Sequence, residues 1–184
     1  MNYYQSFSIV VSNKKISSTM WEAIITSKEI ADISKPGQFI NILPSKKWKN
    51  VMRRPMSIAG IENDQIKLLY KVIGDGTYAM SKWKPGDVVD IIGPLGNFYS
   101  NYENYLPILI GGGTGTAPLL FLRKNMDDKK MISYLIIGAR SKEEHFLSYN
   151  PDKGIYITTD NGSYGIEGTV LTALKKIFKE NQNK

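Results

Sequence analysis

The first hundred residues alternate short apolar segments with polar clusters. Six segments rich in β-branched and aromatic residues are separated by Gly, Pro, Asn, Asp or Lys, a pattern typical of β-strands. No helical period separates them, so we expect six antiparallel strands that close into a Greek-key barrel and leave no exposed sheet edge. The predicted strands are SFSIVVS (6–12), MWEAIIT (20–26), GQFINIL (37–43), MSIAGI (56–61), QIKLLYKV (65–72) and DVVDIIG (87–93).

The pattern changes near residues 100 to 106. Three later segments are almost wholly apolar, as expected for strands of a parallel sheet that is covered on both faces. Helix-length segments follow each of them, and Pro118 suits a first helical turn, while Ser141 and Glu144 have capping-box spacing. The fold class is therefore β followed by α/β, with a barrel over residues 1–102 and a parallel-sheet nucleotide-binding domain over 103–184. The predicted strands are PILIGG (107–112), MISYLIIGA (131–139) and GIYITTD (154–160), and the predicted helices are APLLFLRKNM (117–126), SKEEHFLSYN (141–150) and EGTVLTALKKIFKE (167–180).

Composition narrows the class of protein. The chain has 184 residues, of which 42% are hydrophobic and 22% charged, which is ordinary for a globular protein. Its apolar runs are too short for a membrane span and its first residues lack the order of a secretory signal, so we expect a cytoplasmic protein without a membrane partner. The net charge of +7 comes from dispersed lysines, which favours general solubility or an anionic ligand over nucleic-acid binding.

The chain contains no cysteine and a single histidine. Disulfides, thiol catalysis and a cysteine-bound iron–sulfur cluster are thus excluded within this chain, and no metal site is expected. His145 lies in the charged segment SKEEHF, where we expect a solvated surface side chain.

A glycine-rich segment, LIGGGTGTAPL, joins the first predicted parallel strand to the following helix. Glycines permit a tight turn and close approach of the backbone to a ligand, and N–H groups at a helix start attract phosphate. The spacing differs from the G-x-G-x-x-G fingerprint, so both a phosphate loop and a merely tight turn remain open. The second parallel strand ends near Arg140, Glu143 and Glu144, any of which could contact a ribose, and the choice between NAD and NADP also stays open.

The barrel holds a second group of phosphate-friendly residues. Arg53 and Arg54 precede a predicted strand, where they could form a solvated edge or an anion site. Gly74, Gly76 and Thr77 form a small loop of potential phosphate donors. Two such loops, one in each half, suggest two nucleotide-like ligands that meet between the domains, an arrangement typical of redox proteins.

Six motifs in this order carry a family resemblance: PGQF, RRPMSI, LLYKVIGDGT, KPGDVVDIIGPLGNF, ILIGGGTGTAPLLFL and TTDNGSYGIEGTV. From about residue 5 to its end the chain resembles the ferredoxin-NADP reductase superfamily, and within it the electron-transfer subunits of bacterial and archaeal dihydroorotate dehydrogenases. The resemblance implies an FAD-binding barrel, an NAD(P)-binding domain and hydride transfer from nicotinamide to flavin. It also implies a hetero-complex or oligomer, in which the partner is a catalytic redox subunit or an iron–sulfur protein.

The resemblance also assigns roles to individual residues. Arg54 would pair with the FAD pyrophosphate, and Ser57 would hydrogen-bond near flavin N5 as the catalytic residue. The other residues implied for FAD are Pro55 and Met56 against the flavin, the segment Leu69, Tyr70 and Lys71, and the phosphate donors Gly76 and Thr77. Those implied for the nicotinamide nucleotide are Gly111, Gly112, Gly113, Thr114, Gly115 and Thr116 at its pyrophosphate, with Asp160, Asn161 and Gly162 on the same side.

The chain departs from the family at its carboxyl end. Relatives continue through a CGP-type loop and a cysteine-rich tail with a [2Fe–2S] cluster, and the sequence FKENQNK ends before either. We therefore expect an incomplete nucleotide domain of three parallel strands, the first of them at an open edge or covered by a partner. A naturally reduced member, a truncated chain and a separately encoded remainder are alternatives.

Three functions remain in competition. The leading hypothesis is a flavoprotein electron-transfer subunit that serves a dihydroorotate dehydrogenase catalytic subunit in pyrimidine biosynthesis. The second is a stand-alone NAD(P)H-dependent flavin or ferredoxin reductase, or the small subunit of another redox complex. The third is a non-catalytic docking module that binds flavin or nucleotide.

Overall fold

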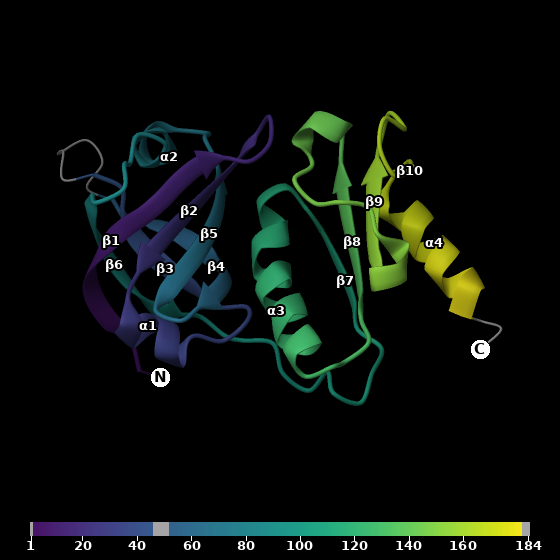
Figure 1. Ribbon diagram of the computed structural model, residues 1–184, viewed down its shortest axis with the longest axis horizontal. Coiled ribbons are helices and arrows are strands. Elements are labelled where there is room, and N and C mark those ends of the chain that lie inside the picture. Colours follow the sequence, from purple (N-terminus) through teal and green to yellow (C-terminus); the bar gives the residue numbers. More distant parts are fainter. Residues whose placement is uncertain (1, 46–51, 182–184) are drawn as a thin grey trace.

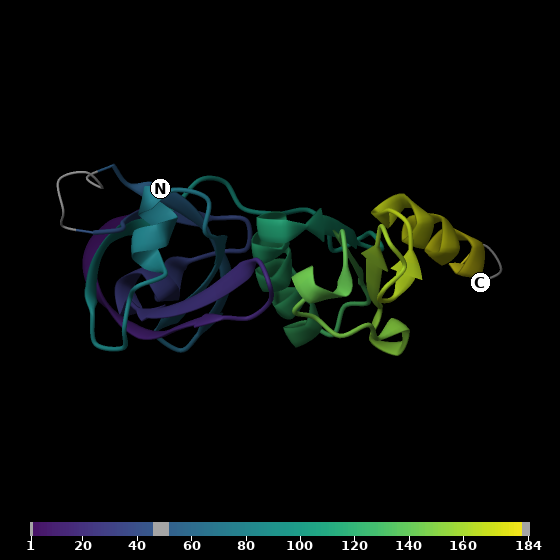
Figure 2. The same cartoon turned by 90° about the horizontal axis from the view of Figure 1, so that it is seen from above.

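The computed structural model describes residues 2–45 and 52–181 of the chain. It consists of a closed barrel and a four-stranded parallel sheet with helices, which lie side by side (Figure 1). Seen from above, the two units form an elongated molecule with the carboxyl-terminal helix at the end remote from the barrel (Figure 2). The predicted fold class is confirmed.

The barrel closes in the order β1-β2-β5-β4-β3-β6, and every neighbouring pair is antiparallel. Alternate side chains point inward, as Ile40 and Ile42 of β3 and Ile66 and Leu68 of β5 illustrate, because successive residues of a strand face opposite sides. The six strands fall where the apolar segments predicted them. Their bounds are Tyr4–Lys15 (β1), Met20–Thr26 (β2), Phe39–Leu43 (β3), Arg54–Glu62 (β4), Gln65–Lys71 (β5) and Val88–Leu95 (β6).

The expectation that no helix interrupts the barrel strands was wrong. Helix α1 spans Lys28–Ile33 and α2 spans Asp75–Met80. Each has only six residues, which is too short for a helical period to stand out in the sequence. Helix α2 begins inside the GDGT segment, which the sequence presents as a loop.

The parallel sheet has the order β10-β9-β8-β7. A short fourth strand, β10, pairs with β9, so the expected count of three strands was too low. Helices α3 and α4 cover opposite faces of the sheet (Figure 2). Among the described residues β7 is the outermost strand on its side, as predicted. The bounds are Ile108–Gly112 (β7), Thr116–Asp128 (α3), Tyr134–Ala139 (β8), Ile155–Thr159 (β9), Ile166–Glu167 (β10) and Val170–Asn181 (α4).

The predicted helix over 141–150 is absent. Only two short 3₁₀ turns form, at Lys142–Glu144 and Pro151–Lys153. The capping box does not form either, because the Ser141 hydroxyl donates to the Glu143 carboxylate, while Glu144 accepts from Arg140. Tertiary contacts keep most of this segment out of a helical conformation, because Phe146 packs against the barrel while Leu147 and Tyr149 pack on the sheet.

Helix α3 joins the two units, because it lies between the barrel and the sheet and packs against β4 (Figure 1). A shared apolar cluster at this junction contains Met20 and Leu69 from the barrel and Ala117 from α3. The backbone N–H of Ser18 also donates to the Glu143 carbonyl at 2.8 Å. These contacts fix the end of the glycine-rich segment against the barrel.

Candidate functional site

A groove of about 290 Å³ runs between the barrel and the start of α3. Its barrel wall comes mainly from the start of β4 and the end of β5, and its other wall comes from the turn that precedes α3 and from the first turn of α3. It therefore brings together predicted residues from both halves of the chain. The lining residues are Pro55, Met56, Ser57, Leu69, Tyr70, Lys71, Ile73, Thr77, Thr114, Gly115 and Pro118.

A second hollow of about 340 Å³ adjoins this groove and shares Pro55, Met56, Ile73 and Thr77 with it. Arg54 lines the second hollow and lies directly over Gly76. A Cβ atom built at Gly76 would lie only 2.7 Å from Arg54 Nε, a separation that real Cβ contacts do not show. The absence of a side chain at Gly76 is thus what lets the guanidinium occupy this position.

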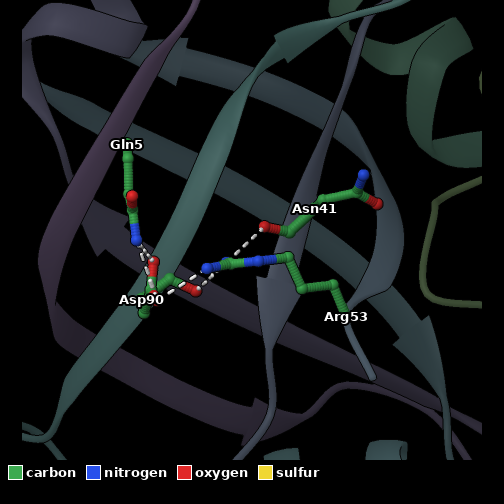
Figure 3. Close-up of polar contacts among 4 residues, drawn as sticks. All are labelled: Gln5, Asn41, Arg53 and Asp90. Atoms are coloured by element: carbon green, nitrogen blue, oxygen red, sulfur yellow. Dashed lines mark hydrogen bonds and ion pairs between the residues drawn. The ribbon is translucent and has the colours of Figure 1, made fainter. Parts of the chain in front are cut away.

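The two consecutive arginines have different surroundings. Arg53 lies on the outer barrel surface and pairs with Asp90 there (Figure 3). Its Nη2 lies 2.6 Å from the Asp90 carboxylate, and its Nη1 donates to the backbone carbonyls of Asp90 and Asn41. Gln5 donates to the same carboxylate at 3.1 Å. Arg54 instead donates to the Met52 carbonyl at 2.8 Å, and within the described ranges no carboxylate lies within ion-pair distance of it. Arg54 is the arginine available to an anion.

The loop before α2 is held in a fixed shape by Thr77. Its Oγ1 accepts from the backbone N–H groups of Ile73 and Gly74, at 3.0 and 3.2 Å, and donates to the Gly74 carbonyl. The first hydrogen bond inside the helix runs from Tyr78 N to Gly74 O, so the N–H groups of the first turn precede any helical partner. The Thr77 hydroxyl therefore shapes the loop, whose residues 74–77 line the second hollow.

The segment Leu69, Tyr70 and Lys71 divides its side chains between the core and the groove. Leu69 is buried in the cluster at the junction of the two units. Tyr70 is buried in the barrel, donates to Asn13 Oδ1 at 2.8 Å, and has its pKa raised to about 12 chiefly by burial. All three residues line the groove, and Lys71 is the one that is only partly buried.

The glycine-rich segment is only partly a turn. Gly111 and Gly112 are the last residues of β7, whereas Gly113–Gly115 form a 3₁₀ turn that leads into α3. A Cβ at Gly111 would meet Leu119 Cδ1 at 2.8 Å, so this glycine serves the packing of the helix on the strand. Gly113 adopts a φ of +53°, in the left-handed region that glycine tolerates.

The remaining residues of this segment differ in exposure. Thr114 and Gly115 line the groove, and a Cβ at Gly115 would meet no atom within 4 Å. Thr116 is fully buried, and its hydroxyl has no hydrogen-bond partner among the described residues. The backbone of the turn, not the Thr116 side chain, is therefore the part that a ligand could reach.

Asp160, Asn161 and Gly162 lie at the carboxyl end of β9, on the same sheet edge as the glycine-rich turn, but none of them lines the groove. Asn161 Oδ1 accepts from the backbone N–H and hydroxyl of Ser163. At the end of the neighbouring strand β8, Arg140 Nε donates to Glu144 at 2.8 Å, so the arginine at this end of the sheet is already paired with a carboxylate.

His145 is half-buried, not solvated as the sequence predicted. Its Nε2 lies 3.0 Å from the Thr158 carbonyl oxygen, and its ring meets Tyr164 edge-to-face. Burial lowers the pKa of His145 below its ordinary value. The charged residues around it in SKEEHF suggested an exposed side chain, whereas His145 attaches the β8–β9 connection to the sheet.

Sequence reasoning missed two groove residues, Ile73 and Pro118. Ile73 is 89% exposed although it is apolar, and Pro118 had been noted only for its place in a helix. The sequence feature that could have indicated Ile73 was its place directly before the Gly-x-Gly turn at residues 74–76. Within the described ranges no cluster of His, Cys, Asp or Glu could hold a metal ion, and no helix is long and apolar enough to cross a membrane.

Comparison with known proteins relates the chain to a class of enzyme. No protein-family model matches the chain. The electron transfer subunit of dihydroorotate dehydrogenase B (NAD(+)) from Fusobacterium nucleatum is 32% identical over 179 residues, which cover 94% of this chain and 69% of the relative. The corresponding subunit from Listeria innocua is 35% identical over 180 residues, with 93% and 69% covered. The chain thus spans about two thirds of the length of these relatives.

Solved structures agree with these relatives. The structure of an NADH-dependent reduced ferredoxin-NADP oxidoreductase matches with a TM-score of 0.82 and 30% identity, over 96% of this chain and 64% of that one. A ferredoxin NADP+ reductase from Neisseria gonorrhoeae with bound FAD and NADP has the same fold, with a TM-score of 0.76 and 17% identity over 99% of this chain and 79% of that one. The chain therefore belongs to the family of the electron-transfer subunits of dihydroorotate dehydrogenase B (NAD(+)), a family of oxidoreductases with the ferredoxin-NADP reductase fold.

Proposed function

We propose that this chain is a flavoprotein electron-transfer subunit that moves electrons between a nicotinamide nucleotide and a catalytic redox partner. The observation that carries the proposal is the shared groove, in which the barrel residues Met56, Ser57 and Lys71 face Thr114 and Gly115 of the glycine-rich turn. A flavin and a nicotinamide must meet for hydride transfer, and this is a surface where residues of both units converge. We assign residues 1–102 to FAD and 103–184 to NAD(P).

The residues of the second hollow fit the phosphates of FAD. Arg54 has no carboxylate partner within the described ranges and presents a guanidinium suited to bidentate phosphate recognition. The glycine at position 76 leaves the space that the guanidinium fills, and the residues of the first turn of α2 line the same hollow. Arg54 with the backbone of Gly76 and Thr77 would hold the pyrophosphate.

The residues of the shared groove fit the flavin ring. FAD, when bound, would supply the acceptance of a hydride and its release as one or two electrons. Pro55 and Met56 give an apolar wall for the ring, and Ser57 lies in the same groove with a hydroxyl that bonds to no other described residue. Ser57 would orient the reacting part of the ring, and no side chain is required to act as a nucleophile.

The names of the relatives support the choice of partners. They are electron transfer subunits of dihydroorotate dehydrogenase B (NAD(+)), which favours a dihydroorotate dehydrogenase catalytic subunit as the partner and NAD as the nucleotide. These 184 residues contain no cysteine, so a cysteine-bound iron–sulfur cluster would have to be held outside them.

The test is whether the purified protein binds FAD and whether NADH or NADPH bleaches the flavin absorbance without oxygen. Bound FAD that either nucleotide reduces is the expected result. A colourless protein that takes up no added FAD would refute the proposal. FAD that stays oxidised with both nucleotides would leave the docking module as the better description.

Arg54→Ala tests the assignment of the FAD phosphates. Loss of a charge-assisted hydrogen bond should weaken FAD binding by about 1.5 to 3 kcal/mol. Arg53→Ala is the matched control, because Arg53 points to Asp90 on the outer barrel and should leave FAD affinity nearly unchanged. Equal losses of FAD affinity in the two variants would contradict the assignment.

A further inference from the structure

Asn13 lies near the end of β1 and faces the interior of the barrel. A bulge in the pairing of β1 with β2 falls between Val10 and Ser12, so Val11 is an extra residue in β1. One extra residue reverses which side chains of a strand face inward. Val10 is fully buried before the bulge, and Asn13 stands opposite the fully buried Ala23 after it. The bulge thus gives the asparagine an inward position that simple alternation would give to Ser12.

The Asn13 amide binds two separate segments of the barrel. Its Oδ1 accepts from the Tyr70 hydroxyl at 2.8 Å, near the end of β5. Its Nδ2 donates to the backbone carbonyls of Met80 at 2.9 Å and of Trp83 at 3.3 Å, at the end of α2 and just beyond it. An amide offers an acceptor oxygen and N–H donors, and here each end of the group holds a different segment.

These two segments are the ends of a stretch that lines both hollows. The barrel residues around the two hollows come from 54–57 and from 69–77. Tyr70 lies at the start of the second stretch, and Met80 lies just beyond its end. Asn13 lines neither hollow. It therefore holds residues 70–80 at both ends from inside the barrel, out of reach of a ligand in the hollows.

The middle of this stretch is held only locally. Residues 72–75 are exposed, and the hydrogen bonds from their backbone to Thr77 Oγ1 tie the loop to α2 itself. The attachment of α2 to the barrel comes from its far end, where the Met80 side chain is buried in the core and its carbonyl accepts from Asn13. The position of the α2 first turn relative to β5 thus depends on contacts that Asn13 makes with both.

We propose that Asn13 is a positioning residue for FAD, which fixes the flavin side of the groove relative to the phosphate-binding turn of α2. This inference rests on the proposed function, because it requires that FAD spans both hollows. A ligand that spans two sites binds best when the sites are already in the matching arrangement, since ordering a loose segment reduces the free energy of binding. Asn13 sets that arrangement without contact to the ligand.

The experiment compares FAD with riboflavin, which has the flavin ring but lacks the phosphates, by fluorescence titration of the apoproteins. Tyr70→Phe removes only the bond to β5. Asn13→Asp keeps an acceptor for Tyr70 and removes the donors to the α2 end, while Asn13→Leu removes all three bonds. Gln38→Leu is the matched control, because Gln38 is a buried amide that joins Lys35 and Gly96 and lines neither hollow. Thermal midpoints are recorded for each variant.

We expect Asn13→Asp to bind FAD about 2- to 12-fold more weakly, as for loss of a neutral hydrogen bond. Its riboflavin affinity should be unchanged, because riboflavin ends before the phosphate-binding turn. Tyr70→Phe should weaken both ligands by a similar factor, since it loosens the flavin side of the groove. Asn13→Leu should weaken FAD more than either of these variants. Gln38→Leu should lower the thermal midpoint and leave both affinities near those of the wild type.

Two results would overturn the inference. FAD affinity within about twofold of the wild type in both Asn13 variants would show that Asn13 positions nothing that FAD contacts. Equal losses of FAD and riboflavin in every variant, Gln38→Leu included, would reduce Asn13 to a general contribution to barrel stability. If Asn13→Leu does not fold, Asn13→Asp and Tyr70→Phe decide between these outcomes. A wild type that takes up no FAD would refute the proposed function, which is distinct from a wild type that binds FAD beside variants that bind it equally well.

Discussion

Gly76→Ala is the sharpest test of how the candidate FAD site is built. The added methyl group would lie 2.7 Å from Arg54 Nε and 3.2 Å from its Cγ and Cζ. All three contacts are to one flexible side chain, so the protein can relieve them by moving Arg54. The fold should therefore survive, while the guanidinium leaves the position from which it would meet the FAD pyrophosphate.

The expected loss follows from the interaction removed. A hydrogen bond to a charged group contributes about 1.5 to 3 kcal/mol, so FAD should bind about 10- to 150-fold more weakly. The apoprotein should be no less stable, because alanine favours a helical position over glycine by up to about 1 kcal/mol. Gly60→Ala is the matched control, since a Cβ at Gly60 lies 4.0 Å from its nearest neighbour, Lys67 Cβ, and Gly60 does not line either hollow.

The assay is fluorescence titration of the apoproteins with FAD, together with their thermal midpoints. The double variant Gly76→Ala, Arg54→Ala should bind FAD no more weakly than Arg54→Ala alone, because both changes remove the same contact. FAD affinity in Gly76→Ala within about twofold of the wild type would refute the role given to the Arg54 position. Equal losses in the Gly60 and Gly76 variants would refute it as well.

Two further predictions concern stability. Burial lowers the pKa of His145 in the folded protein below its ordinary value of about 6.5. As the pH falls, the unfolded chain therefore binds a proton at this residue before the folded protein does. The free energy of unfolding should then decrease as the pH falls from about 6.5 toward the lower pKa of the folded state. The free energy of unfolding, measured with urea from pH 7.5 to 5.5, should therefore fall more in the wild type than in His145→Gln, and parallel curves would contradict this origin. Asp90→Asn leaves the half-buried Arg53 guanidinium without its carboxylate and should lower the free energy of unfolding by about 1 to 3 kcal/mol. Its FAD affinity should stay near that of the wild type, and a large loss would mean that Arg53 is not separate from the cofactor site.

The sequence by itself determined both classes of sheet. The short apolar segments before residue 95 and the continuous apolar runs after 107 are local properties, and they mark antiparallel barrel strands and buried parallel strands. It also indicated that Arg54 and both glycine turns are suited to phosphate binding, because a guanidinium group and exposed backbone N–H groups can bind phosphate wherever they lie. Local pattern failed where length or context mattered, as in the six-residue helices α1 and α2 and in residues 141–150.

Only the tertiary structure decided which of these residues act together. The adjacent arginines look alike in sequence, yet one strand end turns Arg53 toward Asp90 and leaves Arg54 over Gly76. Between Lys71 and Gly113 the chain forms α2, β6, the connection between the units and β7, and the packing of α3 on β4 brings the two residues together. Such contacts depend on long-range packing, which no local pattern encodes, and they decide where charge is available to a ligand.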